Sequence, residues 1–248
     1  MKKFELTSEF ITNVFGVKLF RIRALVEFGN VCKGELGGYV EKEENLDQDG
    51  NAWVTGNAQV YGDAWVYGDA RVTGNAQVYG NARVSGNARV TGNARVSGNA
   101  RVSGNAQVSG NARVSGNAQV TGNARVSGNA RVSGNAQVYG GAWVTGNAQV
   151  YGDAWVYGDA WVYGNAQVSG NAQVYGGADY ATVKGFGRYN RNTTFFRCKD
   201  GKVRVVCGCF FGDMEEFRAI VKRTHGDGKL AKEYLAIADL MEMHFCEE

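Results

Sequence analysis

The amino-acid sequence predicts an all-β solenoid, a parallel β-helix of about seven triangular coils, with a further module at each end. A valine occupies every sixth position from Val54 to Val174, which gives 21 consecutive units without an insertion or deletion. The unit reads Gly-Asn-Ala-x-Val-Ser/Thr/Tyr, and a period this short and strict is typical of solenoids. Because the period is absent at both ends, the chain divides into residues 1–50, 51–178 and 179–248.

A single unit, residues 80–85, shows how a coil is built. Side chains alternate across a strand, so Ala82 and Val84 point inward together while Arg83 between them points outward. The Gly-Asn pair before the strand tolerates the positive φ that a sharp corner requires. Three such units therefore close one triangular coil, and each strand pairs in parallel with the strand three units later.

The N-terminal segment is predicted to be a small β-rich cap, because a solenoid exposes unpaired strand edges at both ends. Residues 17–25 read as a strand, which a turn at residues 15–16 would pair with residues 9–14. Val40 and Leu46 are six residues apart and should enter the first coil, with two additional residues bulging just after them.

The C-terminal segment is predicted to be a ββαα module. Its hairpin joins residues 193–198 to residues 203–207 through Lys-Asp-Gly-Lys, a strong turn signal. With Asp200 and Gly201 as a two-residue loop, Cys198 would lie opposite Val203. In the same register Phe196 would lie opposite Val205, and Thr194 opposite Cys207.

Two helices are predicted after this hairpin. Asp213 and Glu216 form a capping-box pattern, apolar residues follow at helical spacing, and Gly226 ends the first helix. The second helix is predicted from about Leu230 to Phe245, with apolar residues along one side.

Composition favours a cytoplasmic protein that neither enters nor crosses a membrane. No apolar run follows the amino terminus, so we expect no signal peptide and no membrane span. The five cysteines are odd in number and irregularly spaced, which fits a reducing compartment.

The repeat resembles that of the hexapeptide-repeat left-handed β-helix proteins, in which a small residue follows four positions after each aliphatic residue. Val84 followed by Ala88 illustrates a match that recurs in every unit from Asn51 to about Ala178. The resemblance implies left-handed coiling, which is an exception to the usual right-handed crossover. The six-residue period alone would also allow a right-handed helix with triangular coils.

Both end segments resemble those of uncharacterised solenoid proteins of bacteriophages, prophages and Gram-positive bacteria. At the N-terminal end the resemblance lies in residues 28–40 and in Asn45-Leu46. At the C-terminal end it lies in Cys207-Gly208-Cys209-Phe210, Phe217, Thr224-His225-Gly226-Asp227 and Tyr234-Leu235. The resemblance implies a phage or mobile-element origin.

Enzymatic chemistry is not expected from the solenoid. Hexapeptide acyltransferases use a histidine on a coil or loop, and the solenoid carbonic anhydrases need three, but this chain has only His225 and His244, both outside the coils. A metal cluster of Cys198, Cys207 and Cys209 with His225 is disfavoured, because the hairpin separates the first two and Cys-x-Cys lacks the usual zinc spacing. We expect thiols buried under the helices and no cofactor, and we interpret His225 as a partner of the helix dipole.

The outward position before each valine holds eight Arg, eight Gln and five Trp, which form three columns because residues 18 apart stack. One column contains the ladder Arg95, Arg113 and Arg131, and the others contain Arg71 with Arg89 and Arg83 with Arg101. These arginines have two interpretations, a solvated face or a surface for an anion, nucleic acid or protein partner.

Aromatic residues gather toward the two ends of the solenoid, at outward positions. They are interpreted either as docking residues for the end modules or as an interface for self-association or a partner. The candidate interface residues are Tyr139, Trp155, Tyr157, Tyr175, Trp143 and Trp161. We expect a homo-oligomer, dimer or trimer, with Trp155 and Tyr157 as anchors.

The function predicted from the sequence is that of a non-enzymatic binding scaffold that acts by oligomerisation or by capture of a host protein, including a component of a defence system. Two alternative functions are compatible with the same sequence. One is an acyltransferase-like enzyme whose acceptor site lies in the end modules, and the other is a structural polymer-forming protein.

Overall fold

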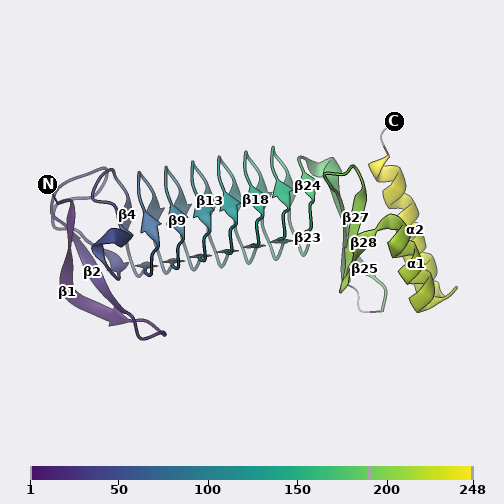
Figure 1. Ribbon diagram of the computed structural model, residues 1–248, viewed down its shortest axis with the longest axis horizontal. Helices are drawn as coiled ribbons and strands as arrows, with labels where there is room; N and C mark the ends of the chain where they lie inside the picture. The colour runs from purple at the N-terminus through teal and green to yellow at the C-terminus, as the bar shows by residue number, and fades with distance from the viewer. Residues whose placement is uncertain (1, 189–190, 247–248) are drawn as a thin grey trace.

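A computed structural model of the chain describes residues 2–188 and 191–246, and Figure 1 shows a straight solenoid with a module at each end. The solenoid contains 21 two-residue strands, from β4 (Trp53–Val54) to β24 (Gln173–Val174). Each strand consists of one repeat valine and the residue before it. The parallel β-solenoid predicted from the sequence is therefore confirmed.

The strands stack in three parallel sheets, two of which contain seven strands each. The register follows the repeat, because Arg95 pairs with Arg113 and Val96 pairs with Val114, 18 residues later. A partial coil precedes the seven regular ones. In it Val40 pairs with Val60 and Leu46 bridges to Val66, a spacing two residues longer than the regular one. The predicted bulge between Leu46 and the first regular coil is therefore confirmed.

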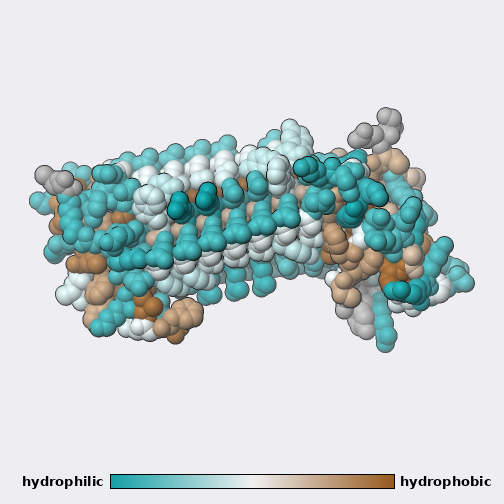
Figure 2. All heavy atoms as spheres, viewed as in Figure 1, coloured by the Kyte–Doolittle hydropathy of each residue, from teal (hydrophilic) through white to brown (hydrophobic). Residues whose placement is uncertain are grey.

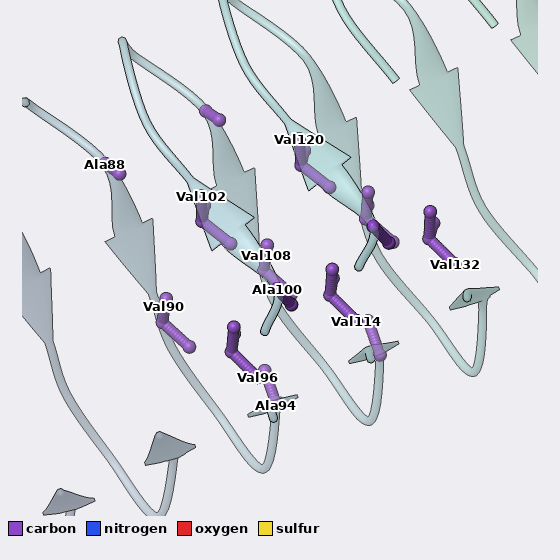
Figure 3. Close-up of a cluster of buried hydrophobic side chains, with 14 of the residues drawn as sticks. Ala88, Val90, Ala94, Val96, Ala100, Val102, Val108, Val114, Val120 and Val132 are labelled. Carbon is purple, nitrogen blue, oxygen red and sulfur yellow. The ribbon is translucent and has the colours of Figure 1, made fainter. Parts of the chain in front are cut away.

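The core of the solenoid is a stack of small aliphatic side chains. All 21 repeat valines are fully buried, and the alanines two positions before them are buried with them. Figure 3 shows these side chains pointing from successive coils into one interior. Burial of each valine stabilises the fold by roughly 1.5–3 kcal/mol, so every added strand increases the stabilisation by a similar amount.

The corners depend on glycine and asparagine in different ways. Gly104 has a φ of +66°, and a Cβ added there would lie 2.9 Å from the backbone nitrogen of Gly122 in the next coil. A larger residue would therefore meet both backbone strain and a backbone clash. The asparagines form ladders instead, because Asn93 Nδ2 donates to Asn111 Oδ1 at 3.1 Å and this contact repeats along the corner. Stacked amide ladders of this kind stabilise parallel, in-register strands.

The N-terminal module is a β cap that covers the first coil. It contains β1 (Phe4–Thr12), β2 (Lys18–Ala24), β3 (Leu36–Val40) and the short 3-10 helix η1 (Glu43–Asn45). The antiparallel pairing of β1 with β2 confirms the predicted hairpin, although β1 begins at Phe4 rather than near residue 9. Phe4 and Ile22 join the solenoid core and close its end.

A buried lysine satisfies backbone groups at this end of the solenoid. The ammonium group of Lys3 donates to the carbonyl oxygens of Asp49, Gly50 and Ala52 at 3.2–3.3 Å. Burial lowers the pKa of Lys3, and the nearby carboxylates of Asp47 and Asp49 oppose that shift. A buried carbonyl group without a hydrogen-bond donor destabilises the fold. Lys3 supplies the donor for three carbonyl groups at the point where the coils end.

The C-terminal module is a four-stranded antiparallel sheet followed by two helices. Its elements are the 3-10 turn η2 (Gly177–Asp179), β25 (Tyr180–Phe186), β26 (Arg191–Arg197), β27 (Val203–Cys207), β28 (Phe210–Asp213), α1 (Met214–His225) and α2 (Lys229–Phe245). The predicted hairpin and both helices are present, but the ββαα prediction missed the outer strands β25 and β28. Both are difficult to recognise in the sequence, because β28 is short and β25 contains Gly185 near its end.

This sheet stands between the end of the solenoid and the helices, as Figure 1 shows, and both of its faces carry buried residues. Tyr180, Phe196 and Cys198 belong to the solenoid core and close it at this end. Phe195 and Val205 point to the other face and pack against α1 and α2. The module therefore caps the solenoid with one face and builds a core of its own with the other.

The hairpin register predicted from the sequence is wrong by one residue. Phe196 pairs with Arg204 rather than Val205, and Thr193 rather than Thr194 pairs with Cys207. The reason is a three-residue loop in which Gly201 takes a φ of +75°. Cys198 N donates to Lys202 O at 2.9 Å, so these two residues close the loop. A turn followed by a left-handed residue is the usual three-residue hairpin connection.

The helix boundaries follow the predicted signals. The Asp213 carboxylate accepts from Glu216 N, and the Glu216 carboxylate accepts from Asp213 N, both at 2.9 Å. Gly226 has a φ of +58° at the end of α1. Within residues 2–188 and 191–246, neither helix is long and apolar enough to cross a membrane.

Candidate functional site

The arginine ladder lies on the face formed by the ten-stranded sheet. Arg95 of β11 (Arg95–Val96), Arg113 of β14 (Arg113–Val114) and Arg131 of β17 (Arg131–Val132) are consecutive neighbours in that sheet. All three side chains are exposed. Gln77 precedes the ladder and Gln149 follows it, as the 18-residue spacing predicts. Figure 2 shows hydrophilic residues in rows along the solenoid.

The remaining arginines occupy the other two faces. Arg71 and Arg89 are neighbours in one column, and Arg83 and Arg101 are neighbours in another. Arg71 is half-buried, whereas the others are exposed. The candidate cations therefore do not meet at one point. Only the ladder brings three of them together.

The ladder arginines have no acidic partner in the described part of the chain. None of them takes part in an ion pair there, and no carboxylate follows Asp69 in the sequence until Asp153. Neighbouring guanidinium groups on adjacent strands, about 5 Å apart, repel one another unless solvent or an anion screens them. An anion on this face would remove that repulsion.

A shallow groove of about 440 Å³ lies beside the last two arginines of the ladder. Arg113, Arg131 and Gln149 form one side of the groove. The other side consists of the hydroxyl-bearing residues Ser115, Ser133 and Tyr151, which are also 18 residues apart. Guanidinium and hydroxyl groups together are suited to phosphate or carboxylate oxygens. The structure thus places hydrogen-bond donors on both sides of this groove.

The aromatic residues at the N-terminal end dock the cap. Trp53 is 1 % exposed, and its ring meets Phe4 and Phe28 edge-on at 6.3 and 5.3 Å. The prediction that every Trp position is exposed is therefore wrong at Trp53, because the cap folds over it. Tyr61 is also buried and stacks on Tyr79 at 5.0 Å.

The aromatic residues at the C-terminal end remain largely uncovered. Tyr139 stacks on Tyr157 at 5.1 Å, Tyr157 meets Tyr175 edge-on at 5.2 Å, and Trp155 packs beside Tyr139. Tyr175 is 62 % exposed and Trp155 is 38 % exposed. Partial burial, with Tyr157 adding to it, raises the pKa of Tyr139, so this group stays neutral at physiological pH. We call these four residues the aromatic cluster.

A second aromatic stack lies on the neighbouring face. Trp143 and Trp161 stack at 4.9 Å with an interplanar angle of 7°. The Arg125 guanidinium lies 4.7 Å from the Trp143 ring centroid, in cation–π geometry. Trp161 is 56 % exposed. Each of the six aromatic candidates is therefore either exposed to solvent or packed against an exposed aromatic ring.

The histidines and cysteines of the described residues do not form a metal-binding cluster. His225 stacks on Tyr234 in the C-terminal module, and the described residues contain no His, Cys, Asp and Glu group able to hold a metal ion. Cys198 is buried against the solenoid end, where burial raises its pKa to about 11. Cys207 is half-buried on the helix side of the sheet and Cys209 is exposed, so the expectation of thiols buried under the helices is wrong for Cys198 and Cys209.

Comparison with protein families supports the solenoid assignment. The model of the YdcK beta solenoid repeat matches residues 58–74, 64–80, 76–92, 82–96, 94–108, 106–122, 118–134, 124–140, 130–146 and 148–164. All of these matches lie inside the solenoid and together cover less than half of the chain. A search of the curated proteins found no match to this sequence. The repeat region is therefore similar to a known β-solenoid repeat.

Proposed function

We propose that this chain is a non-enzymatic scaffold of the cytoplasm that binds an anionic partner through the ladder of Arg95, Arg113 and Arg131. The observation that carries the proposal is the row of exposed guanidinium groups, without an acidic partner among the described residues, beside a hydroxyl-lined groove. A rigid solenoid keeps such a row at a constant spacing. Binding of a regularly charged partner therefore costs the solenoid little conformational entropy.

The resemblance of both end segments to phage and prophage solenoid proteins supports a mobile-element origin. For a protein of that origin, a host macromolecule is the natural partner, and a component of a host defence system is one such target. The resemblance of the repeat to left-handed hexapeptide solenoids is compatible with this role, because one fold hosts many unrelated functions.

The ladder is tested by replacing Arg95, Arg113 and Arg131 together with Gln, the residue already present elsewhere in that column. With a labelled single-stranded DNA oligonucleotide as the anionic probe, we expect weaker binding by fluorescence anisotropy. In a plot of log affinity against log salt concentration, the slope should become less steep by about two if three phosphate contacts disappear. The fold should survive, because Gln occupies the same outward position at Gln77 and Gln149.

The matched control is a triple replacement of Arg83, Arg101 and Arg125 with Gln, which removes the same charge from the other two faces. If both triple variants lose affinity equally, the whole solenoid acts as a diffuse cation and the ladder is not a site. Recovery of the same host partners by the ladder variant and the unchanged protein from lysate would also contradict the proposal.

We further propose that the chain forms a dimer or trimer through the aromatic cluster. Replacing Trp155 and Tyr157 with Ser should lower the mass measured by light scattering to that of a monomer, because Trp and Tyr dominate interface energies. The control is the same change at Trp65 and Tyr67, since Trp65 is also 38 % exposed and lies in the same column at the other end. A monomeric mass for the unchanged protein would contradict self-association.

A further inference from the structure

The C-terminal module contains a pocket that the solenoid surface does not explain. The pocket has a volume of about 390 Å³ and lies between the last turns of α1, the first turns of α2 and the turn joining β27 to β28. Its walls include the buried residues Phe217, Val221 and Tyr234. A concave, mostly apolar space of this size is typical of small-molecule sites.

Polar groups converge at the rim of this pocket. Arg188, Thr224 and His225 reach it from two different segments, and Cys207 and Cys209 reach it from the β27–β28 turn. The His225 ring stacks on Tyr234, with ring centroids 5.9 Å apart. Among the described residues that line the pocket, Arg188 is the one permanently charged group and none is a carboxylate. This described lining suits an anionic group better than a cationic one.

The backbone beside the pocket is held close to Tyr234. Gly187 has a φ of +73°, and a Cβ added there would lie 1.9 Å from the Tyr234 hydroxyl oxygen. Any residue with a side chain would clash here, so the backbone at Gly187 rests directly on the tyrosine. This close packing fixes the start of the segment that brings Arg188 to the rim.

We propose that the pocket binds a small molecule with a flat apolar body and a single acidic group. The body lies against Phe217 and Tyr234, where aromatic side chains offer stacking and edge contacts. The acidic group lies at the rim, where Arg188 and His225 can donate hydrogen bonds to it. The site is separate from the arginine ladder, because the C-terminal sheet stands between the pocket and the solenoid.

The test uses two dyes that share one aromatic body. Anilinonaphthalene sulfonate carries an acidic group, whereas phenylnaphthylamine is its neutral counterpart, and both fluoresce more strongly in an apolar site. We expect each dye to bind the full-length chain saturably, at one site per chain. Arg188→Gln should weaken the sulfonate about tenfold, the usual effect of a lost charge-assisted hydrogen bond, and leave the neutral dye within about twofold.

Blocking the pocket should affect both dyes. Thr224 is exposed at the rim, so Thr224→Trp fills the space without changing the buried core, and it should weaken both dyes at least about tenfold. A Thr224→Phe variant should give an intermediate loss, and it keeps the test valid if the larger ring disturbs the module. Unchanged melting of each variant shows that the module remains folded.

The matched control is Arg223→Gln, which removes an exposed charge from the adjacent position of α1, outside this pocket. It should leave both affinities unchanged. Absence of saturable binding by the unchanged chain would overturn the proposal, and so would equal losses for both dyes with Arg188→Gln or an effect of Arg223→Gln equal to that of Arg188→Gln. None of these results bears on the arginine ladder, so the two proposals fail separately.

Discussion

Replacing Val108 with Asp is expected to lower the free energy of unfolding by about 3–5 kcal/mol, the range found when a buried charge is left without a partner. Val108 is fully buried, and its stacked neighbours Val90 and Val126 offer only hydrocarbon. A carboxylate there must either remain charged in the core or take up a proton at a cost. Urea unfolding followed by circular dichroism measures the difference.

The control for Val108→Asp is Gln107→Asp, the same acidic residue one position earlier on the outward face. Gln107 stands between Arg89 and Arg125 in its column, so a carboxylate there gains two cationic neighbours. We expect its stability to stay within about 0.5 kcal/mol of the unchanged protein, as for most surface substitutions. Equal unfolding midpoints for both variants would show that the interior of the solenoid is not closed as described.

Replacing Trp53 with Ala is expected to cost about 3–5 kcal/mol, the usual range for removing a buried tryptophan. Trp53 holds the N-terminal cap through edge contacts with Phe4 and Phe28. Since the loss falls at the docking surface, the cap should detach before the coils unfold. Hydrogen exchange should therefore accelerate over β1 and β2 more than over the central strands, and exposure of the first coil should promote aggregation.

Two further variants separate ring packing from other effects at Trp53. Its indole Nε1 is buried and has no hydrogen-bond partner among the described residues, so Trp53→Phe should cost less than Trp53→Ala. Trp161→Ala is the matched control, because Trp161 occupies the same column but is 56 % exposed and rests on Trp143. Its expected cost is about 1 kcal/mol or less, as for one aromatic pair. A cap that exchanges slowly in Trp53→Ala would contradict the docking role.

The coils could be predicted from the sequence because their contacts repeat at a constant separation. Once the unit places Val84 inward, the next valine six residues later must do the same, and every strand finds its partner 18 residues away. The columns of the candidate site follow from that spacing alone, which is why the ladder Arg95, Arg113 and Arg131 appears in the structure as predicted. No long-range packing choice enters this part of the fold.

The end modules could be predicted only in part, because their packing depends on segments that do not repeat. The helix caps at Asp213 and Gly226 are local signals and were recognised. The register of the hairpin depends on whether its loop contains two or three residues, and Asp200-Gly201 is compatible with both. The pocket near Arg188 and His225 was missed, because it combines residues from four separate segments that meet only after the helices pack on the sheet.

The sequence by itself determined the solenoid, its inward valines and its outward columns, because an unbroken six-residue period puts the same side chains inward in every unit. Only the tertiary structure decided which of the outward side chains remain exposed to solvent. Trp53 and Trp161 occupy equivalent positions of the repeat and the same column, yet one is covered by the cap and the other remains exposed. The difference lies in what each end module places over its coil, and that is a contact between distant parts of the chain which no local pattern encodes.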